Sequence, residues 1–250
     1  MIDSSSNETK TFAALDPRAI ALLLDVDGTL LDIASTPEAV QVPDDLRSSL
    51  QQLIKTTGGA LALVSGRLIE NLDDLFSPLR FSAIGAHGAQ MRVGATAIDR
   101  GVQPLPQNLR KRLAEAVAWG ALVEDKTYSL ALHYRLAPEL KKRLEKFAEE
   151  TIAQYPGEAI EIEPNKMVIE IKRRAVDKGG AVCALMTHSP FAGRVPVFIG
   201  DDLTDQSVFS VLPNMGGKGF SVGEKFAGLS GMFMSPAQVR DALHELAARA

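Results

Sequence analysis

Hydrophobic and polar positions follow two different patterns along this chain. Unbroken apolar runs predict strands buried on both faces at three places: residues 19–24, 60–64 and 195–199. Apolar residues recur at helical spacing over 46–54, and a further helix at about 68–76 and a short strand at 81–84 follow. This strand–helix–strand–helix–strand order predicts right-handed crossovers and a parallel sheet. The same pattern returns after residue 175, with a helix, the run at 195–199, a last strand at about 219–222 and a final helix.

Between these two stretches the apolar and polar residues alternate. The elements expected are a hairpin at 90–98, helices at 106–119 and 138–154, and strands at 121–125, 128–135, 159–163 and 167–171. Alternation indicates strands with one solvated face, which favours antiparallel pairing. We therefore expect a flexible N-terminal tail at 1–17, a parallel-sheet core at 18–90 and 175–250, and an inserted α/β domain at 91–174.

Composition narrows the class of protein. A hydrophobic fraction of 46% and a charged fraction of 23% are those of an ordinary soluble globular protein. The net charge is −4, so the chain lacks the excess of positive charge that is typical of nucleic-acid-binding proteins, and no nucleic-acid partner is expected. The N-terminal stretch lacks the basic and apolar regions of a signal peptide, and no apolar run is long enough to span a bilayer. We expect a cytoplasmic protein without a membrane partner; the sequence does not determine the oligomeric state, and a monomer is the default expectation.

The chain has a single cysteine, Cys183, which excludes an internal disulfide. Its neighbours, Gly179 to Leu185, are mostly apolar and small. This setting predicts a helix interior and a buried, unreactive thiol.

Polar side chains follow the buried strands where parallel strands reach their carboxyl ends. They are Asp25 and Asp27 after the first run, Ser65 and Arg67 after the second, Lys178 at the start of a helix, and Asp201, Asp202 and Asp205 after the last run. Open α/β sheets bind ligands at this edge. Acids held close together favour a cation, and Mg²⁺ binds through one or two carboxylates and substrate phosphate. The set is suited to phosphoryl transfer with an Asp nucleophile, an aspartyl-phosphate intermediate and a second Asp that moves the proton.

These residues resemble, in order and type, the four motifs of the haloacid dehalogenase (HAD) superfamily. The motifs are Asp25-x-Asp27-Gly28-Thr29, Ser65, Lys178 and Gly200-Asp201-Asp202-x-x-Asp205. The resemblance implies an α/β fold: a HAD-like Rossmannoid parallel-sheet core with an inserted α/β cap domain. Together with them, Ser65-Gly66-Arg67, Gly85-Ala86-His87-Gly88, His133-Tyr134-Arg135 and Glu170-Ile171-Lys172 are similar to segments of the trehalose-6-phosphate phosphatase family.

This narrower resemblance implies a role for each core motif. Asp25 would be the nucleophile and Asp27 the general acid/base. Mg²⁺ would be held by the Asp25 carboxylate, the Asp27 carbonyl and Asp201, with Asp202 or Asp205 as support behind these ligands. The phosphoryl group would be held by Ser65, Gly66, Arg67 and Lys178. For Arg67 the alternative is a pair with an acid. Gln206, next to Asp205, departs from the Glu that the family usually has.

The inserted domain would recognise the sugar through polar side chains on or beside its strands. These are Glu124, Lys126, His133, Arg135, Asn165, Lys166 and Glu170, with His87 at the hinge. The alternative for each strand residue is a solvated strand face, and for Lys166 an exposed turn. For His87 the alternative is local hydrogen bonding.

The resemblance implies Mg²⁺-dependent hydrolysis of trehalose 6-phosphate, the last step of trehalose biosynthesis. A HAD phosphatase for sucrose 6-phosphate or for glucosyl- or mannosyl-3-phosphoglycerate would share all four motifs. A phosphomutase would share them too, but it would keep the phosphoryl group on the sugar. A sugar-phosphate sensor without turnover should have lost a catalytic side chain, and none is lost. No G-x-x-x-x-G-K-[ST] or dinucleotide fingerprint is present.

Overall fold

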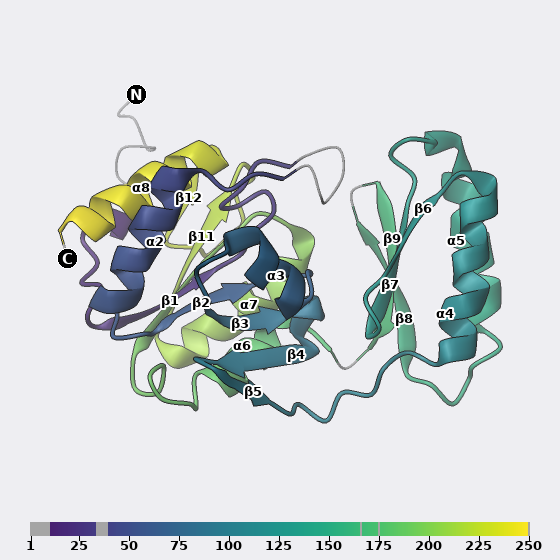
Figure 1. Ribbon diagram of the computed structural model, residues 1–250, viewed down its shortest axis with the longest axis horizontal. Helices are drawn as coiled ribbons and strands as arrows, with labels where there is room; N and C mark the ends of the chain where they lie inside the picture. Colours follow the sequence, from purple (N-terminus) through teal and green to yellow (C-terminus); the bar gives the residue numbers. More distant parts are fainter. Residues whose placement is uncertain (1–10, 34–39, 166, 175, 250) are drawn as a thin grey trace. The chain divides into compact units, whose positions relative to one another are not determined.

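The computed structural model describes residues 11–33, 40–165, 167–174 and 176–249, with the backbone alone for Pro164 and Asn165. The chain divides into two compact units (Figure 1). The first unit comprises Met1–Asp99 and Lys178–Ala250, and the second comprises Arg100–Asp177. The second unit is therefore an insertion within the first.

The described part of the first unit is built on an eight-stranded sheet. Its strands are β1 (Ile20–Leu24), β2 (Leu61–Val64), β3 (Ser82–Gly85), β4 (Gln90–Val93), β5 (Thr96–Ile98), β10 (Val195–Gly200), β11 (Lys218–Val222) and β12 (Gly231–Phe233). Their order is β12-β11-β10-β1-β2-β3-β4-β5. The strands from β12 to β3 are parallel, whereas β4 and β5 join antiparallel.

Helices cover both faces of this sheet, and the side chains of β1 show why. Leu22 and Leu24 pack on one face with α2 (Asp44–Thr56), α3 (Ile69–Phe76) and α8 (Pro236–Ala248). Ala21 and Leu23 pack on the other face with α6 (Lys178–Leu185) and α7 (Gln206–Val211). Successive side chains of a strand point to opposite faces, so an unbroken apolar run is satisfied only when both faces are covered. The expected α/β fold class is confirmed.

Register brings the carboxyl ends of the central strands level. Leu24 of β1 pairs with Ile199 of β10 and with Leu63 of β2. The N–H of Asp25 still donates to the carbonyl of Ile199, at 2.9 Å. The residues that leave β1, β2 and β10 therefore start from one edge of the sheet, where a binding site is expected in this architecture.

The second unit is an antiparallel sheet backed by helices. The strands β6 (Leu122–Asp125), β7 (Ser129–His133), β9 (Val168–Arg173) and β8 (Ile160–Asn165) lie in that order. Leu130, Leu132 and Ile171 pack with α4 (Gln107–Ala114) and α5 (Lys141–Ile152) in a separate core. Trp119 packs edge-on against Phe147 at 4.8 Å. The helices are shorter than expected because α4 continues and α5 begins as 3-10 turns, η3 (Glu115–Trp119) and η4 (Pro138–Leu140).

Several features differ from the sequence prediction. The hairpin at 90–98 extends the large sheet, which places residues 91–99 with the first unit instead of the inserted domain. Phe12, expected in the tail, is buried against Phe220 and Phe233, while residues 1–10 lie outside the described part.

Cys183 is exposed, so the prediction of a buried thiol was wrong; α6 turns this side away from the sheet. Strand β12 was not predicted.

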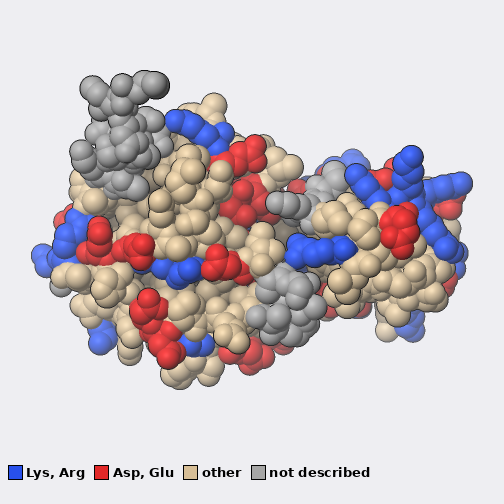
Figure 2. Space-filling view, turned by 90° about the horizontal axis from the view of Figure 1, so that it is seen from above, with Lys and Arg blue, Asp and Glu red and all other residues tan. Residues whose placement is uncertain are grey.

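The surface of the second unit carries many Lys and Arg side chains (Figure 2). Some of these side chains pair with acids: Arg112 of α4 pairs with Glu115, the first residue of η3, and Lys146 pairs with Glu150 within α5. Such helical pairs stabilise weakly and indicate a solvated, mixed-charge surface. Within the described residues, none of the helices combines the length and the apolar character that a membrane crossing requires.

Candidate active site

Three side chains from separate elements meet at the carboxyl edge of the large sheet. Lys178, the first residue of α6, donates from Nζ to Oδ1 of Asp25 at 2.9 Å and to Oδ1 of Asp205 at 2.8 Å. Asp25 follows β1, and Asp205 ends the 3-10 turn η5 (Leu203–Asp205) after β10. All three are almost fully buried. Buried charges are tolerated when they are paired and hydrogen-bonded, and here one ammonium group satisfies two carboxylates.

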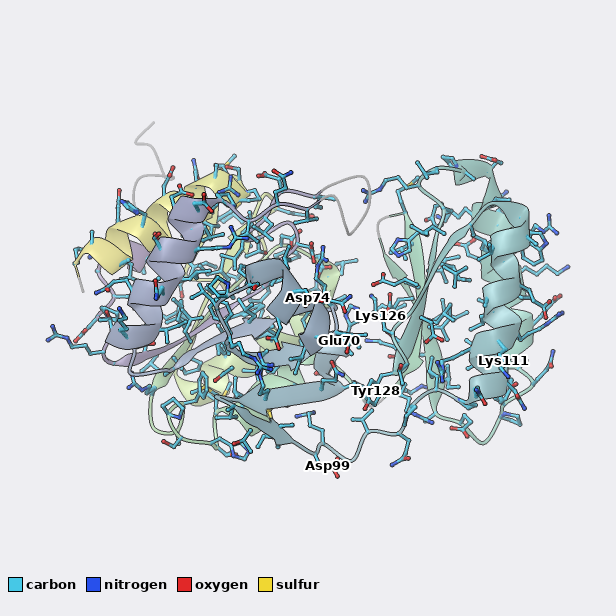
Figure 3. The ribbon with its side chains drawn as sticks, viewed as in Figure 1. Glu70, Asp74, Asp99, Lys111, Lys126 and Tyr128 are labelled. Carbon is cyan, nitrogen blue, oxygen red and sulfur yellow. The ribbon has the colours of Figure 1, made fainter. Side chains whose placement is uncertain are left out.

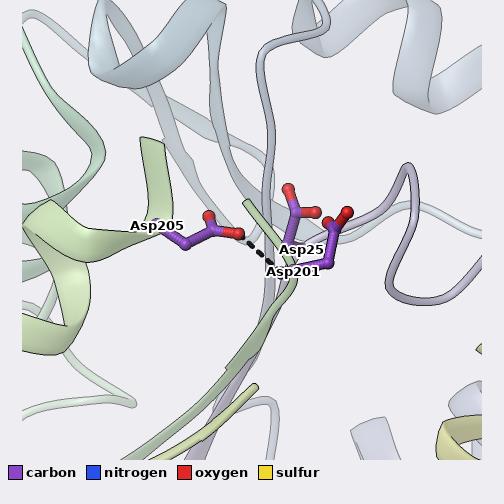
Figure 4. Close-up of side chains that lie close together, drawn as sticks. All are labelled: Asp25, Asp201 and Asp205. Carbon is purple, nitrogen blue, oxygen red and sulfur yellow. Dashed lines mark hydrogen bonds between the residues drawn. The ribbon is translucent and has the colours of Figure 1, made fainter. Parts of the chain in front are cut away.

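Asp201 completes an acidic trio with Asp25 and Asp205 (Figure 4). One carboxylate oxygen of each lies within 4.8 Å of the others. The Asp201 N–H donates to Oδ2 of Asp205 at 2.9 Å, and Thr29 donates from Oγ1 to Oδ1 of Asp201 at 3.1 Å. Asp205 was expected behind the metal ligands; it lies within the trio, with its oxygens already bonded to Lys178 and to backbone N–H groups.

Asp202 closes the turn that carries Asp205. Its Oδ1 accepts from the Thr204 N–H at 2.9 Å and from the Thr204 hydroxyl at 2.6 Å. Its carboxylate and that of Asp205 cap η5 reciprocally, each accepting from the other's backbone N–H. Asp202 thus acts on the site by holding Asp205 in place.

The charges of this cluster are strongly coupled. Burial raises the pKa of Asp25 to about 8 against the opposing charge of Lys178. Burial also raises the pKa of Asp205 to about 8 and that of Asp201 to about 7. Burial alone would lower the pKa of Lys178, but Asp205 and Asp25 raise it well above its usual value. Three carboxylates against one ammonium group leave a negative excess, which a bound cation would remove.

The donor set fits a hard divalent cation. Carboxylate oxygens from different chain segments, close together and partly satisfied by a lysine, suit Mg²⁺ rather than a metal that prefers sulfur or imidazole ligands. No His or Cys belongs to the trio. The acidic trio can therefore hold a metal ion.

Asp27 and Arg67 form a bidentate ion pair at the same edge. Arg67 donates from Nε to Oδ2 and from Nη2 to Oδ1 of Asp27, both at 2.7 Å. The N–H of Arg67 donates to Oγ of Ser65, which is buried at the end of β2. The sequence left two roles open for Arg67, phosphate binding or a pair with an acid, and the structure shows this pair with Asp27.

His87 lies against the Ser65–Arg67 turn, in η2 (Ala86–Gly88). The N–H groups of Ala86 and His87 donate to the carbonyls of Arg67 and Ser65, at 2.8 and 3.1 Å. The His87 ring is so close to Gly66 that a β-carbon there would lie 2.5 Å from Cε1. His87, expected among the substrate-binding residues, is thus part of the packing of this turn.

The second unit brings four of the expected sugar-binding residues into one network, and Figure 3 labels one of them, Lys126. His133 Nε2 lies 3.2 Å from Oε2 of Glu124, and Lys126 Nζ lies 3.8 Å from Glu124 and 3.5 Å from Oε1 of Glu170. The hydroxyl of Ser129 donates to Oε1 of Glu170 at 2.6 Å. Burial would raise the pKa of Glu124, but the hydrogen bond to His133 and the charge of Lys126 hold it below its usual value.

Pairing register explains this network, since Glu124, Ala131 and Glu170 are opposite one another across β6, β7 and β9. Sequence reasoning missed Ser129; its only signal was the same face as Ala131 in the alternating pattern. Arg135 is exposed in the turn after β7. Asn165 ends β8, and Lys166 lies outside the described residues.

Solved structures share this architecture. The C-terminal domain of Candida albicans trehalose-6-phosphate phosphatase superposes with a TM-score of 0.79 over 98% of this chain and 97% of that one, at 21% identity. A haloacid dehalogenase-like hydrolase from B. subtilis superposes with a TM-score of 0.62 over 89% of this chain and 98% of that one, at 13% identity. At these identities the likeness shows the fold alone, an α/β fold that this chain shares with both proteins.

Sequence comparison narrows the class. The family model for trehalose-phosphatase matches residues 23–228, and the chain belongs to this family. It is 43% identical over 206 residues to a probable trehalose-phosphate phosphatase of Sinorhizobium fredii strain NGR234, covering 81% of this chain and 77% of that protein. It is 41% identical over 207 residues to trehalose-6-phosphate phosphatase of Escherichia coli K12, with the same two coverages.

Proposed function

We propose that this protein hydrolyses trehalose 6-phosphate to trehalose and phosphate, the last step of trehalose biosynthesis. The observation that carries the proposal is the buried contact of Lys178 with Asp25 and Asp205 at the carboxyl edge of the sheet. It occurs in a chain 41–43% identical to proteins named for this activity.

In the proposed mechanism the phosphoryl group passes through Asp25. A carboxylate oxygen of Asp25 attacks phosphorus in line, forming an aspartyl-phosphate while the bond to the sugar oxygen breaks. Asp27 gives its proton to that oxygen, then takes one from the water that cleaves the acyl-phosphate. Ser65 and the ammonium group of Lys178 would hold the phosphoryl oxygens. The first half-reaction leaves Asp27 ionised and Asp25 phosphorylated; the second returns the proton to Asp27, frees Asp25 and releases phosphate, so the two together restore the starting state.

Mg²⁺ would be held by the Asp25 and Asp201 carboxylates and the Asp27 carbonyl. It would supply positive charge that offsets the acidic cluster and the phosphoryl oxygens. Asp202 and Asp205 would support it from behind, since Asp202 caps the turn of Asp205 and Asp205 binds the backbone of Asp201.

The second unit is proposed to be the cap that recognises the sugar. The network of Glu124, Lys126, His133 and Glu170 offers acceptors and donors that suit a disaccharide rich in hydroxyl groups. Arg135, Asn165, Lys166 and His87 are proposed to complete recognition. A small-molecule sugar phosphate is the proposed partner, and we propose a cytoplasmic monomer, which light scattering would test against the chain mass of 26.9 kDa.

The test is phosphate release from trehalose 6-phosphate, sucrose 6-phosphate, glucose 6-phosphate and glucosyl-3-phosphoglycerate, with Mg²⁺ and with EDTA. The expected result is a metal-dependent preference for trehalose 6-phosphate. Asp25→Asn should abolish release, whereas Asp32→Asn, which removes an exposed carboxylate paired with Arg240, should leave it unchanged. Preference for another sugar phosphate would overturn the specificity, and turnover by the Asp25→Asn protein would overturn the covalent mechanism.

A further inference from the structure

The ion pair between Arg67 and Asp27 is bidentate. Both carboxylate oxygens of Asp27 accept from the guanidinium group, each at 2.7 Å. Bidentate pairs of this kind fix orientation as well as adding energy, because two parallel bonds stop the carboxyl group from rotating. The Arg67 side chain is 13% exposed and that of Asp27 is 37% exposed, so the arginine is the anchored partner and the acid is the accessible one.

The backbone of Arg67 is itself held at both its N–H and its carbonyl. Its N–H donates to Ser65 Oγ, and its carbonyl accepts from Ala86. Ala86 and His87 adopt φ angles of 48° and 55°, a left-handed conformation that costs energy in residues with a side chain. Such strain persists where the surroundings over-determine it, and functional sites are common examples. The turn is therefore built to present the guanidinium group in one direction.

We propose that Arg67 is a positioning residue for proton transfer: it aims the Asp27 carboxyl group at the leaving oxygen and does not act by gripping the phosphoryl group. This inference rests on the proposed function. The bidentate pair fits the ionised carboxylate, which is the form left after the proton has passed to the sugar oxygen and the form that then takes a proton from water. When Asp27 carries the proton, one oxygen can keep its bond to Arg67 while the other presents the proton.

Leaving-group chemistry separates this role from phosphate binding. A sugar alkoxide is strongly basic and leaves only if it is protonated, whereas 4-nitrophenolate is weakly basic and leaves without an acid. A residue that acts through Asp27 therefore matters for the transfer of the phosphoryl group from the sugar phosphate to Asp25 and not for its transfer from the aryl phosphate. The later cleavage of the aspartyl-phosphate by water needs Asp27 as a base whichever substrate formed it, so only the first step separates the two roles. A residue that holds phosphoryl oxygens, or one that merely supports folding, matters equally for both.

The experiment measures the rate at which the leaving group is released in the first turnover, which reports phosphoryl transfer to Asp25, for trehalose 6-phosphate and for 4-nitrophenyl phosphate in the Mg²⁺-loaded enzyme. Since general acid–base catalysis contributes about 10²–10⁴-fold, Arg67→Met should lower this first-turnover rate by about 100-fold for the sugar phosphate and by no more than about twofold for the aryl phosphate. Arg67→Lys should not restore the rate, because an ammonium group lacks the planar fork. Asp27→Asn should show the same selectivity, and the double variant should fall no further than Asp27→Asn alone.

Two outcomes would overturn the inference: an equal loss on both substrates, or losses that multiply in the double variant. The first-turnover release of 4-nitrophenolate by each variant reports that the protein is folded and that Asp25 still works. Asp25→Asn, which should lose both activities, keeps a failure of the proposed function distinct from a failure of this inference.

Discussion

The α-carbon of Gly28 packs directly against the carboxylate of Asp201. A β-carbon on Gly28 would lie 2.6 Å from the carboxyl carbon of Asp201, and Gly28 has a φ of +84°. Only glycine both adopts this left-handed backbone conformation without strain and leaves room for the Asp201 carboxylate. The glycine of the first motif thus makes room for an acid of the last.

Gly28→Ala should lose metal affinity as well as stability. The β-carbon forces Asp201 away from the trio, and the positive φ costs about 1 kcal/mol or more of unfolding free energy. Gly193→Ala is the matched control, because Gly193 has a φ of +78° and a β-carbon there would meet nothing within 4 Å. Thermal melting and a Mg²⁺ titration of both variants would check this; equal Mg²⁺ affinity in the two would contradict it.

Asp201→Asn should make the metal-free protein more stable and abolish stabilisation by Mg²⁺. The substitution removes one of three carboxylates that repel one another around a single lysine, and it removes a proposed ligand. The amide oxygen can still accept from Thr29, so the local fold is kept. Melting temperatures with EDTA and with Mg²⁺ measure both effects, and a metal-free variant less stable than wild type would count against the charge argument.

Stability of the metal-free protein should fall as pH rises. Folding raises the pKa of Asp25 from 3.8 to about 8 and of Asp201 to about 7, so the folded state binds more protons than the unfolded state in this interval. This contribution is full below pH 3.8 and is lost as pH rises through the folded values. Mg²⁺ should therefore raise the melting temperature more at about pH 8 than at about pH 5. An equal rise at both would exclude these carboxylates as its source.

The contribution of Asp73 to stability should change with pH in the opposite direction. Its two oxygens accept from Arg92 at 2.6 Å, and these bonds hold the pKa of Asp73 below 3.8. The stability it contributes is present above pH 3.8 and is lost as pH falls through the lower folded value. Asp73→Asn should cost roughly 1.5–3 kcal/mol near neutral pH, as bonds to charged groups do. Urea unfolding at about pH 7 and about pH 3 tests this.

A matched control for Asp73 lies next to it on α3. Asp74 is exposed, so Asp74→Asn should leave the urea midpoint nearly unchanged at both pH values (Figure 3). If Asp73→Asn were as mild as Asp74→Asn at neutral pH, the bidentate pair would not be stabilising.

Glu170→Gln should impair sugar recognition without affecting the phosphoryl chemistry. Glu170 is buried and accepts from Ser129, and its charge is balanced by Lys126. KM for trehalose 6-phosphate should rise about tenfold, the size of a lost charged hydrogen bond, while 4-nitrophenyl phosphate is hydrolysed as before. Glu150→Gln, at an exposed pair with Lys146, is the control. Loss on both substrates would place Glu170 outside sugar recognition.

The parallel core was predictable because its signals are local. Leu22 and Leu24 face one layer of helices and Ala21 and Leu23 the other, so the run itself reports burial on both faces. The sequence predicted β4 and β5 as a hairpin, but the alternation of apolar and polar residues does not indicate which sheet a hairpin joins. The burial of Cys183 was wrongly predicted because α6 is short and apolar on most sides. Its exposed face has too few polar residues to be recognised in the sequence.

The sequence predicted which residues belong to the site but not which of them contact one another. Motif residues lie at strand ends, and the register of β1 with β10 then brings Asp25 and Asp201 together. The Arg67–Asp27 pair joins residues that follow different strands, and the turn of Arg67 is held by the left-handed residues Ala86 and His87. Sequence spacing carries no information about such a turn in residues other than glycine.

The insertion of the second unit has two unequal seams. The chain leaves the large sheet from β5, an edge strand separated from β1 by three others, and it returns at Lys178, the residue that contacts Asp25 and Asp205. A replacement module could be spliced in loosely at the first seam. At the second junction, an added or deleted residue would shift Lys178 away from Asp25 and Asp205. Exchange of the inserted unit during evolution is therefore more restricted at its C-terminal junction than at its N-terminal one.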